Sequence, residues 1–161
     1  KKRQNSSKVM SEGQWNIAKR NAKKIIRSIT QKNLILIIVS LYWAEGAKKD
    51  FSFSNTDPRM IRIFIHVLKK VFGISDNDFK ISIRVYEDLD KNECVQYWLK
   101  ISGLKHELKD ISVNELKGSK KGKLKYGMCR VRVKKGGLLL KKFISIISRI
   151  DNLIGSRSSI G

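Results

Sequence analysis

The most suggestive chemistry in this sequence is a glutamate at the end of an apolar helix. Residues 33–44 are almost uninterrupted in their apolar character, which predicts a helix with Asn33 as its N-cap, and Glu45 and Gly46 follow directly. A carboxylate near a helix C-terminus is disfavoured by about 0.3–1 kcal/mol, because the orphan carbonyls there are already negative. A divalent cation such as Mg²⁺ would offset that repulsion, since it binds carboxylate and carbonyl oxygens together. A solvated glutamate explains the same pattern without a ligand.

Three segments with alternating side chains predict a second kind of chemistry, the binding of nucleic acid. In a strand, residues two apart share a face, so segments 50–54, 80–86 and 126–135 each present one apolar and one polar face. The eight outward positions that we predict as contacts contain no acid and are Ser52, Ser54, Ser82, Arg84, Tyr86, Arg130, Arg132 and Lys134, to which we add the neighbouring Lys48 and Lys49. Arginine can bond guanine edges bidentately, serine and tyrosine can bond bases or phosphates, and a β-ribbon fits the major groove. The alternative is an ordinary solvated sheet face with incidental basic residues.

The charge of the whole chain indicates a polyanionic partner. Its 161 residues include 35 Lys and Arg against 14 Asp and Glu, which gives a formal net charge of +21. Such an excess predicts binding to nucleic acid or to an anionic membrane. The longest apolar stretch, residues 34–43, is shorter than the roughly 20 residues that span a bilayer, so we expect no membrane partner. We expect double-stranded DNA, with RNA as a less favoured alternative because the strand faces suit the major groove of a DNA duplex.

The remaining candidates for metal or redox chemistry lack partners in the sequence. His66 and His106 have no second ligand at metal spacing. Cys94 and Cys129 have no CxxC spacing, which favours two reduced core thiols and a cytoplasmic, intracellular protein that is nucleoid-associated through DNA. The acids at 87–90 are explained by a turn that leads into a helix capped by Asp90. The chain begins with Lys rather than an initiator Met and shows no apolar leader, as expected of a partial or trimmed chain.

The elements that must position these residues are helices alternating with strands. The sequence predicts helices over 14–32, 33–44, 58–72, 90–102 and 137–154, with Asp57 capping the third, and a hairpin or flexible loop over 105–125. The expected fold class is α+β, with an antiparallel or mixed sheet that has one helix-covered face and one basic face turned to DNA. The expected organisation is a basic N-terminal arm and helix (1–32, ten basic residues and one acid), a folded domain (33–154) and a flexible tail (155–161).

Residues 38–46, with the sequence IVSLYWAEG, resemble the LAGLIDADG motif of homing endonucleases. Glu45 stands in place of the motif's last acid and Gly46 in place of its final glycine. The strand-to-helix run from Phe51 to Pro58, the later VFGI at 71–74, and the strand YGMCRVRV at 126–133 resemble a bacterial and archaeal subgroup whose motif has the form LYWAEG. The resemblance covers about residues 34–150.

This resemblance implies a LAGLIDADG-like fold and a homodimer, because the chain has one motif. The motif helices would pack together through Ile37, Ser40, Leu41 and Ala44. Glu45 would be catalytic and, with the backbone carbonyl of Ala44, would bind Mg²⁺ for site-specific hydrolysis of DNA phosphodiester bonds. Trp43 stands where many members have an additional acid, and Ser40 replaces a glycine or alanine. The alternatives are a DNA-binding regulator that keeps the fold without cleavage and, less favoured, an intron RNA maturase.

Overall fold

The computed structural model of the protein describes residues 2–107, 110–118 and 124–155, with side chains from residue 9 onward. Contacts divide the chain into two units, Lys1–Asn33 and Leu34–Gly161. The first unit contains α1 (Lys2–Ile25), which begins well before the predicted residue 14, and the first residues of α2 (Gln31–Glu45). At the other end of the chain, α5 (Gly137–Gly155) includes the first residue of the predicted tail, and the remainder of that tail lies outside the described residues.

The motif helix α2 begins earlier than predicted, because two polar residues cap it together. The backbone N–H and the hydroxyl of Thr30 both donate to Asn33 Oδ1, at 3.0 and 2.7 Å, and the Asn33 N–H donates to Thr30 Oγ1 at 3.2 Å. This reciprocal arrangement is a capping box in which Thr30 is the N-cap and Asn33 the third helical residue. The prediction of Asn33 as the N-cap is therefore wrong.

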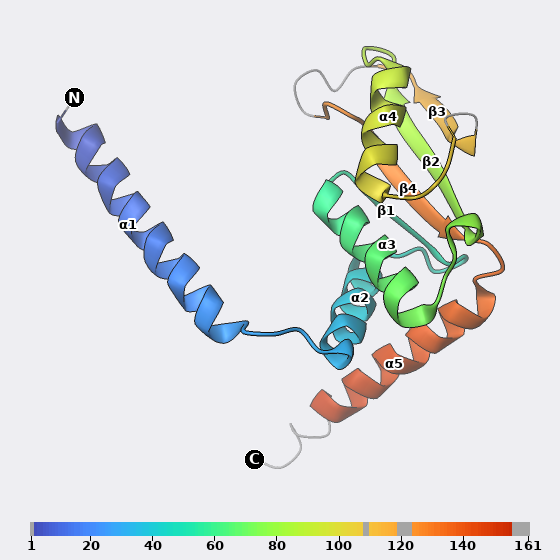
Figure 1. Cartoon of the computed structure of the whole chain (residues 1–161), viewed down its shortest axis with the longest axis horizontal. Helices are drawn as coiled ribbons and strands as arrows, with labels where there is room; N and C mark the ends of the chain where they lie inside the picture. Colours follow the sequence, from blue (N-terminus) through green and yellow to red (C-terminus); the bar gives the residue numbers. More distant parts are fainter. Residues whose placement is uncertain (1, 108–109, 119–123, 156–161) are drawn as a thin grey trace. The chain divides into compact units, whose positions relative to one another are not determined.

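Four strands form one mixed sheet, which confirms the predicted α+β class. β1 (Ser52–Asn55), β2 (Phe79–Tyr86), β3 (Ser112–Leu116) and β4 (Met128–Val133) lie in the order β1-β4-β2-β3 (Figure 1). β4 is antiparallel to both of its neighbours, and β3 is parallel to β2.

β3 corrects the prediction of a hairpin or flexible loop over residues 105–125. Its sequence, SVNEL, is mostly exposed and shows no apolar alternation, so it carries no strand signal of its own. An edge strand pairs with only one neighbour, and this one is positioned by its backbone bonds to β2. Residues 108–109 and 119–123 of the predicted segment lie outside the described residues.

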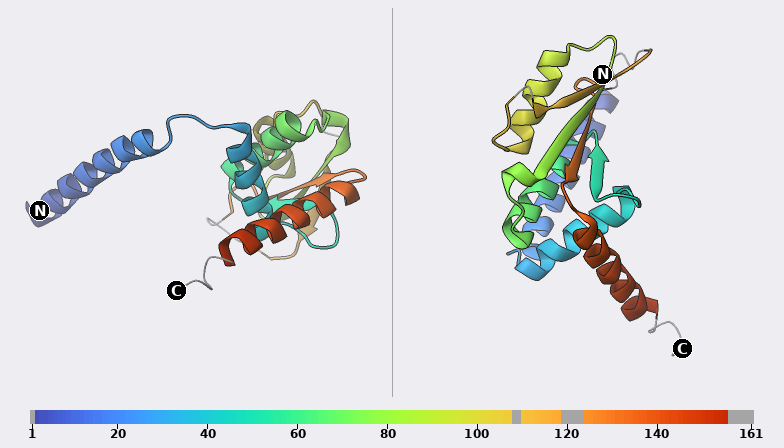
Figure 2. Two further views of the ribbon diagram at one scale, coloured as in Figure 1. Left: turned by 90° about the horizontal axis from the view of Figure 1, so that it is seen from below. Right: turned by 90° about the vertical axis from the view of Figure 1, so that its right-hand side faces the viewer.

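α3 (Pro58–Phe72) and α4 (Lys91–Ser102) lie on the same side of the sheet (Figure 2). The side chain of Asp57 accepts a hydrogen bond from the Arg59 N–H, and that of Asp90 accepts one from the Glu93 N–H, so both predicted caps are confirmed. The Arg59 side chain, hydrogen-bonded to Asp57, lowers the pKa of that carboxyl to about 2. The cap therefore stays ionised well below neutral pH.

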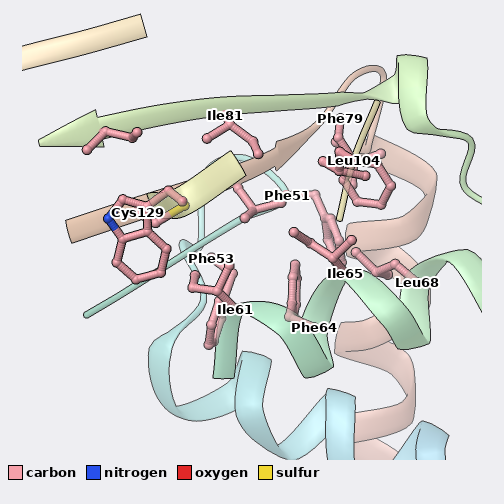
Figure 3. Close-up of a cluster of buried hydrophobic side chains, with 14 of the residues drawn as sticks. Phe51, Phe53, Ile61, Phe64, Ile65, Leu68, Phe79, Ile81, Leu104 and Cys129 are labelled. Carbon is pink, nitrogen blue, oxygen red and sulfur yellow. The ribbon is translucent and has the colours of Figure 1, made fainter. Parts of the chain in front are cut away.

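The core lies between the sheet and these helices (Figure 3) and contains a group of stacked aromatic rings. Phe53 and Phe64 stack with ring centres 4.5 Å apart, and Tyr42 of α2 stacks on Phe51 at 4.7 Å. Phe143 of α5 meets the Tyr42 and Phe51 rings edge-on. α2 and α5 are thereby attached to the end of the sheet at which β1 begins.

The two cysteines are buried and unpaired, as predicted for core thiols. Burial raises the pKa of both Cys94 and Cys129 above the usual range of a thiol. A buried, protonated thiol is a poor nucleophile and a poor metal ligand, so neither cysteine is a candidate for chemistry.

Candidate nucleic-acid interface

The side of the sheet turned away from α3 and α4, here called the open face, carries polar residues of β1, β2 and β4. Along β2, Ile81, Ile83 and Val85 are buried, whereas the residues between them are exposed or half-buried. Residues opposite one another in neighbouring strands share a face, and the register places Arg130 between Ser54 and Ser82. The predicted division of the strands into an apolar and a polar side is confirmed.

Most of the predicted contact residues come together on the open face. They are Ser52 and Ser54 on β1, Ser82, Arg84 and Tyr86 on β2, and Arg130 and Arg132 on β4. Sequence reasoning missed Lys80, which lies opposite Arg132 and is exposed. The sequence pattern could have identified it, because Lys80 precedes the apolar Ile81 just as Ser82 precedes the apolar Ile83.

Three predicted lysines lie beside the strands rather than within them. Lys134 follows the end of β4, and its Nζ donates to the backbone carbonyl of Asn77 at 2.5 Å. Lys48 and Lys49 lie in the turn after α2, where Lys48 Nζ donates to the Trp43 carbonyl at 2.9 Å. Lys48 thus satisfies a carbonyl at the C-terminal end of the motif helix, the end at which a cation is favoured.

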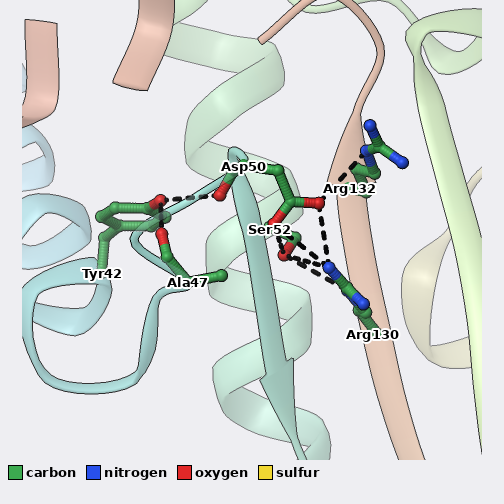
Figure 4. Close-up of polar contacts among 6 residues, drawn as sticks. All are labelled: Tyr42, Ala47, Asp50, Ser52, Arg130 and Arg132. Atoms are coloured by element: carbon green, nitrogen blue, oxygen red, sulfur yellow. Dashed lines mark hydrogen bonds and ion pairs between the residues drawn. The ribbon is translucent and has the colours of Figure 1, made fainter. Parts of the chain in front are cut away.

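Asp50, which begins the predicted strand segment 50–54 but was not among the predicted contact residues, orients the arginines of β4 (Figure 4). Arg130 Nη2 lies 3.1 and 2.9 Å from the two carboxylate oxygens of Asp50, and Arg132 Nε lies 3.3 Å from Oδ2. The side chains of Arg130 and Arg132 remain 42% and 56% exposed. Both guanidinium groups are therefore oriented by Asp50 while still accessible to a ligand.

Ser52 is buried beneath the Arg130 side chain and holds Asp50 and Arg130 in place, so it does not face a ligand. It is only 1% exposed, its hydroxyl donates to Asp50 Oδ1 at 2.9 Å, and it accepts from Arg130 Nη2 at 3.0 Å. The prediction of an accessible Ser52 is therefore wrong. The Arg130 side chain, which comes from a strand far away in the sequence, covers it.

The turn that carries Asp50 is held by Tyr42 and Gly46. The Tyr42 hydroxyl donates to the carbonyl of Ala47 and, at 3.2 Å, to that of Asp50. Burial, with a smaller contribution from the charge of Asp50, raises the pKa of Tyr42 to about 12, so the phenol stays a donor. A Cβ on Gly46 would lie 2.4 Å from the Tyr42 carbonyl oxygen, so only glycine fits at this position.

Two adjoining hollows at one end of the open face are lined by cations. The larger has a volume of about 420 Å³, and its lining includes Lys80, Lys134 and His106 together with one acid, Asp110. The smaller, of about 170 Å³, includes Lys80, Arg130 and Arg132. His106 Nε2 is buried and has no hydrogen-bond partner among the residues that the structure describes. Hollows with this lining are suited to phosphate oxygens, which accept bonds from lysine, arginine and a histidine N–H.

Glu45 is the last residue of α2 and is exposed. The residues of the predicted dimer interface lie on the side of α2 away from the core: Ile37, Ser40 and Ala44 are exposed and Leu41 is half-buried. Within residues 2–107, 110–118 and 124–155, no group of three or more His, Cys, Asp and Glu side chains could hold a metal ion.

Comparison with protein-family models, curated proteins and solved structures finds no match to this chain. None of the helices that the structure describes is long and apolar enough to cross a membrane.

Proposed function

We propose that the protein binds duplex DNA on the open face of its sheet. The observation that carries this proposal is the set of cations gathered there, with Lys80, Arg84 and Arg132 exposed and Asp50 as the acid that orients two of the arginines. A sheet face with this composition can contact phosphates along the backbone and base edges in the major groove. The net charge of +21 favours association with a polyanion at every stage of approach.

The salt dependence of binding tests this proposal. We expect the logarithm of the binding constant for a 20-base-pair duplex to fall with the logarithm of salt concentration with a slope of roughly −5 or steeper. The double variant Lys80→Ala/Arg84→Ala should make the slope shallower by about 2, because each lost phosphate contact accounts for about 0.9. Lys141→Ala/Arg149→Ala, which removes the same residue types from the exposed side of α5, is the control and should change the slope far less. Equal effects of the two variants would show that the open face is not the interface.

We further propose that the protein is a homodimeric, Mg²⁺-dependent, site-specific DNA endonuclease of the LAGLIDADG type. The outward side of α2 supports this proposal, because its exposed Ser40 and Ala44 are small enough for a second α2 to pack closely, and the exposed Ile37 adds apolar area. Such packing would bring the two Glu45 carboxylates together at the helix ends. Mg²⁺ bound there would activate water and stabilise the leaving oxygen of the phosphodiester. Glu45 and the Ala44 carbonyl of each copy would hold it.

The substitution Glu45→Gln separates this enzyme from a DNA-binding regulator. It removes the charge while keeping the shape, so DNA binding should be retained or tightened, and Mg²⁺-dependent cleavage of a selected site should fall by orders of magnitude. Glu87→Gln, at an exposed acid outside α2, is the matched control. Wild-type protein that binds a selected site and leaves it intact in both Mg²⁺ and Mn²⁺ would support the regulator instead.

A further inference from the structure

The open face accounts for a small part of the positive charge of this protein. Its cations and those beside it, Lys48, Lys49, Lys80, Arg84, Arg130, Arg132 and Lys134, are seven of the 35 Lys and Arg residues. A second group of cations lies on the opposite side of the folded domain, on the outer surface of the helices that cover the sheet. The proposed DNA interface gives these residues no role.

The outer side of α3 is a continuous basic stripe. Arg59, Arg62, His66, Lys69 and Lys70 recur at spacings of three and four residues, which places them on one side of the helix. The residues of the other side, among them Ile61, Phe64 and Leu68, are buried against the sheet. α3 contains no acid at all.

The stripe borders a groove between α3 and α4 that is itself basic. The groove has a volume of about 580 Å³, and its lining includes Arg62, His66, Lys69 and Lys70 from α3 and Lys100 from α4. Two neighbouring acids are already engaged: Asp57 pairs with Arg59, and Asp76 with Lys69. Among the residues that the structure describes, no acid pairs with Arg62, Lys70 or Lys100.

Helix stability explains only part of this stripe. Lysines in the last turn of a helix are favoured by the helix dipole, which accounts for Lys69, Lys70 and Lys100. Arg62 and His66 lie in the middle of α3, where the dipole gives no such benefit. Arg59 and Arg62 are like charges three residues apart on the same side of the helix, which costs the helix a few tenths of a kcal/mol, about 0.2–0.5. A phosphodiester backbone lying along the stripe would relieve that repulsion.

We propose that the α3–α4 groove is a second nucleic-acid-binding surface, which takes the backbone of a second DNA duplex while the first occupies the open face. This inference rests on the proposed DNA binding and adds a second site to it. The two surfaces lie on opposite sides of the same sheet-and-helix layer, so two duplexes can be held at once without competing for space. The groove presents lysines and single arginines to a backbone, which gives binding without base readout.

A two-duplex capture assay with the full chain tests this inference. One unlabelled 20-base-pair duplex is immobilised and saturated with protein, and retention of a fluorescent duplex of unrelated sequence is measured. The test variant is Arg62→Gln/Lys70→Gln, and the control is Lys141→Gln/Arg149→Gln. Each pair removes one arginine and one lysine eight residues apart on a helix, and glutamine keeps a similar helix propensity, so both variants should fold.

We expect wild type and the control to retain the second duplex and the α3 variant to retain at least tenfold less. All three proteins should bind the immobilised duplex within about twofold of one another. The salt slope for capture of the second duplex should become shallower by about 2 in the α3 variant, as expected for two lost phosphate contacts.

Three outcomes would overturn the inference while leaving the proposed function intact. The first is wild-type protein that binds the immobilised duplex and never captures another. The second is that the α3 variant captures the second duplex as well as wild type does. In that case the two duplexes would be bound by the two open faces of a dimer. The third is that a fluorescent single-stranded RNA, offered in the same assay, is retained while the fluorescent duplex is not. Wild-type protein that fails to bind the immobilised duplex would instead contradict the proposed function itself.

Discussion

The open face of the sheet has two halves that hold their cations in different ways. On β4, which we call the anchored half, Arg130 and Arg132 lie against Asp50, and Arg130 also bonds Ser52. On β2, the free half, Lys80 and Arg84 are exposed and have no side-chain hydrogen bond or ion pair within the described part of the chain. The two halves are adjacent strands of one sheet, so this difference is due to one acidic residue and the turn that carries it.

The two halves differ in net positive charge and in how firmly their side chains are oriented. Asp50 cancels one of the two positive charges of the anchored half, but it fixes the planes of both guanidinium groups before any ligand arrives. Oriented arginines lose less conformational entropy on binding, which suits directional bonds to base edges. The free half keeps its full charge, and its side chains lose more conformational entropy when they bind. This combination suits contacts with phosphates, which depend less on direction. We therefore expect the anchored half to contribute selectivity and the free half to contribute salt-dependent affinity.

The largest expected effect comes from breaking the turn beneath the anchored half. Gly46→Ala would place a Cβ 2.4 Å from the backbone oxygen of Tyr42 and 2.5 Å from its ring, so the chain must move. We expect a loss of about 3 kcal/mol in the free energy of unfolding, at the upper end of the cost of overpacking. Chemical denaturation followed by tryptophan fluorescence measures it. Gly137→Ala, with nothing within 4 Å of its new methyl group, is the control and should be neutral or slightly stabilising.

A comparison of Arg130→Ala with Arg84→Ala sharpens the distinction between the halves. Each substitution should weaken binding of a selected DNA site by about 1–3 kcal/mol. Arg130→Ala should also relax the preference at particular base pairs and reduce protein stability by about 1 kcal/mol, because Asp50 and Ser52 lose their partner. Arg84→Ala should weaken all sequences alike and leave stability unchanged. Identical binding profiles for the two variants would mean that anchoring by Asp50 has no consequence for recognition.

The smallest expected effect concerns the hydroxyl that holds the Asp50 turn. Tyr42→Phe should cost about 1 kcal/mol of stability at neutral pH, because the Ala47 and Asp50 carbonyls lose a donor. The pKa of Tyr42 is about 12 in the folded protein, above its ordinary value of 10.0, so ionisation favours the unfolded chain. Its contribution is complete below pH 10 and is lost as the pH rises towards 12. The stability difference between wild type and Tyr42→Phe should therefore shrink over that interval, and a difference that stays constant would contradict this role of the hydroxyl.

Local patterns in the sequence were sufficient wherever the structure obeys a local rule. The bounds of α3, its Asp57 cap and its Pro58 start follow from residues within one helical turn of each other. The polar and apolar sides of β2 follow from the twofold alternation of a strand, so most of the open face could be predicted before any pairing of strands was known. The start of α2 was misplaced because the capping box joins Thr30 to Asn33 and only the second of these borders the apolar run.

The amino-acid sequence by itself determined the α+β class, the two caps of the helix layer and which side chains of each strand are polar, because these depend on periodicity and on neighbours a few residues away. Only the tertiary structure decided that β3 joins the sheet, that Ser52 is buried, and that Asp50 lies beneath Arg130. Asp50 and Arg130 are 80 residues apart in the chain, and they meet because Asp50 lies in the turn that leads into β1, which pairs with β4. That pairing is set by backbone hydrogen bonds and by the packing of the whole core, and no short stretch of sequence contains either.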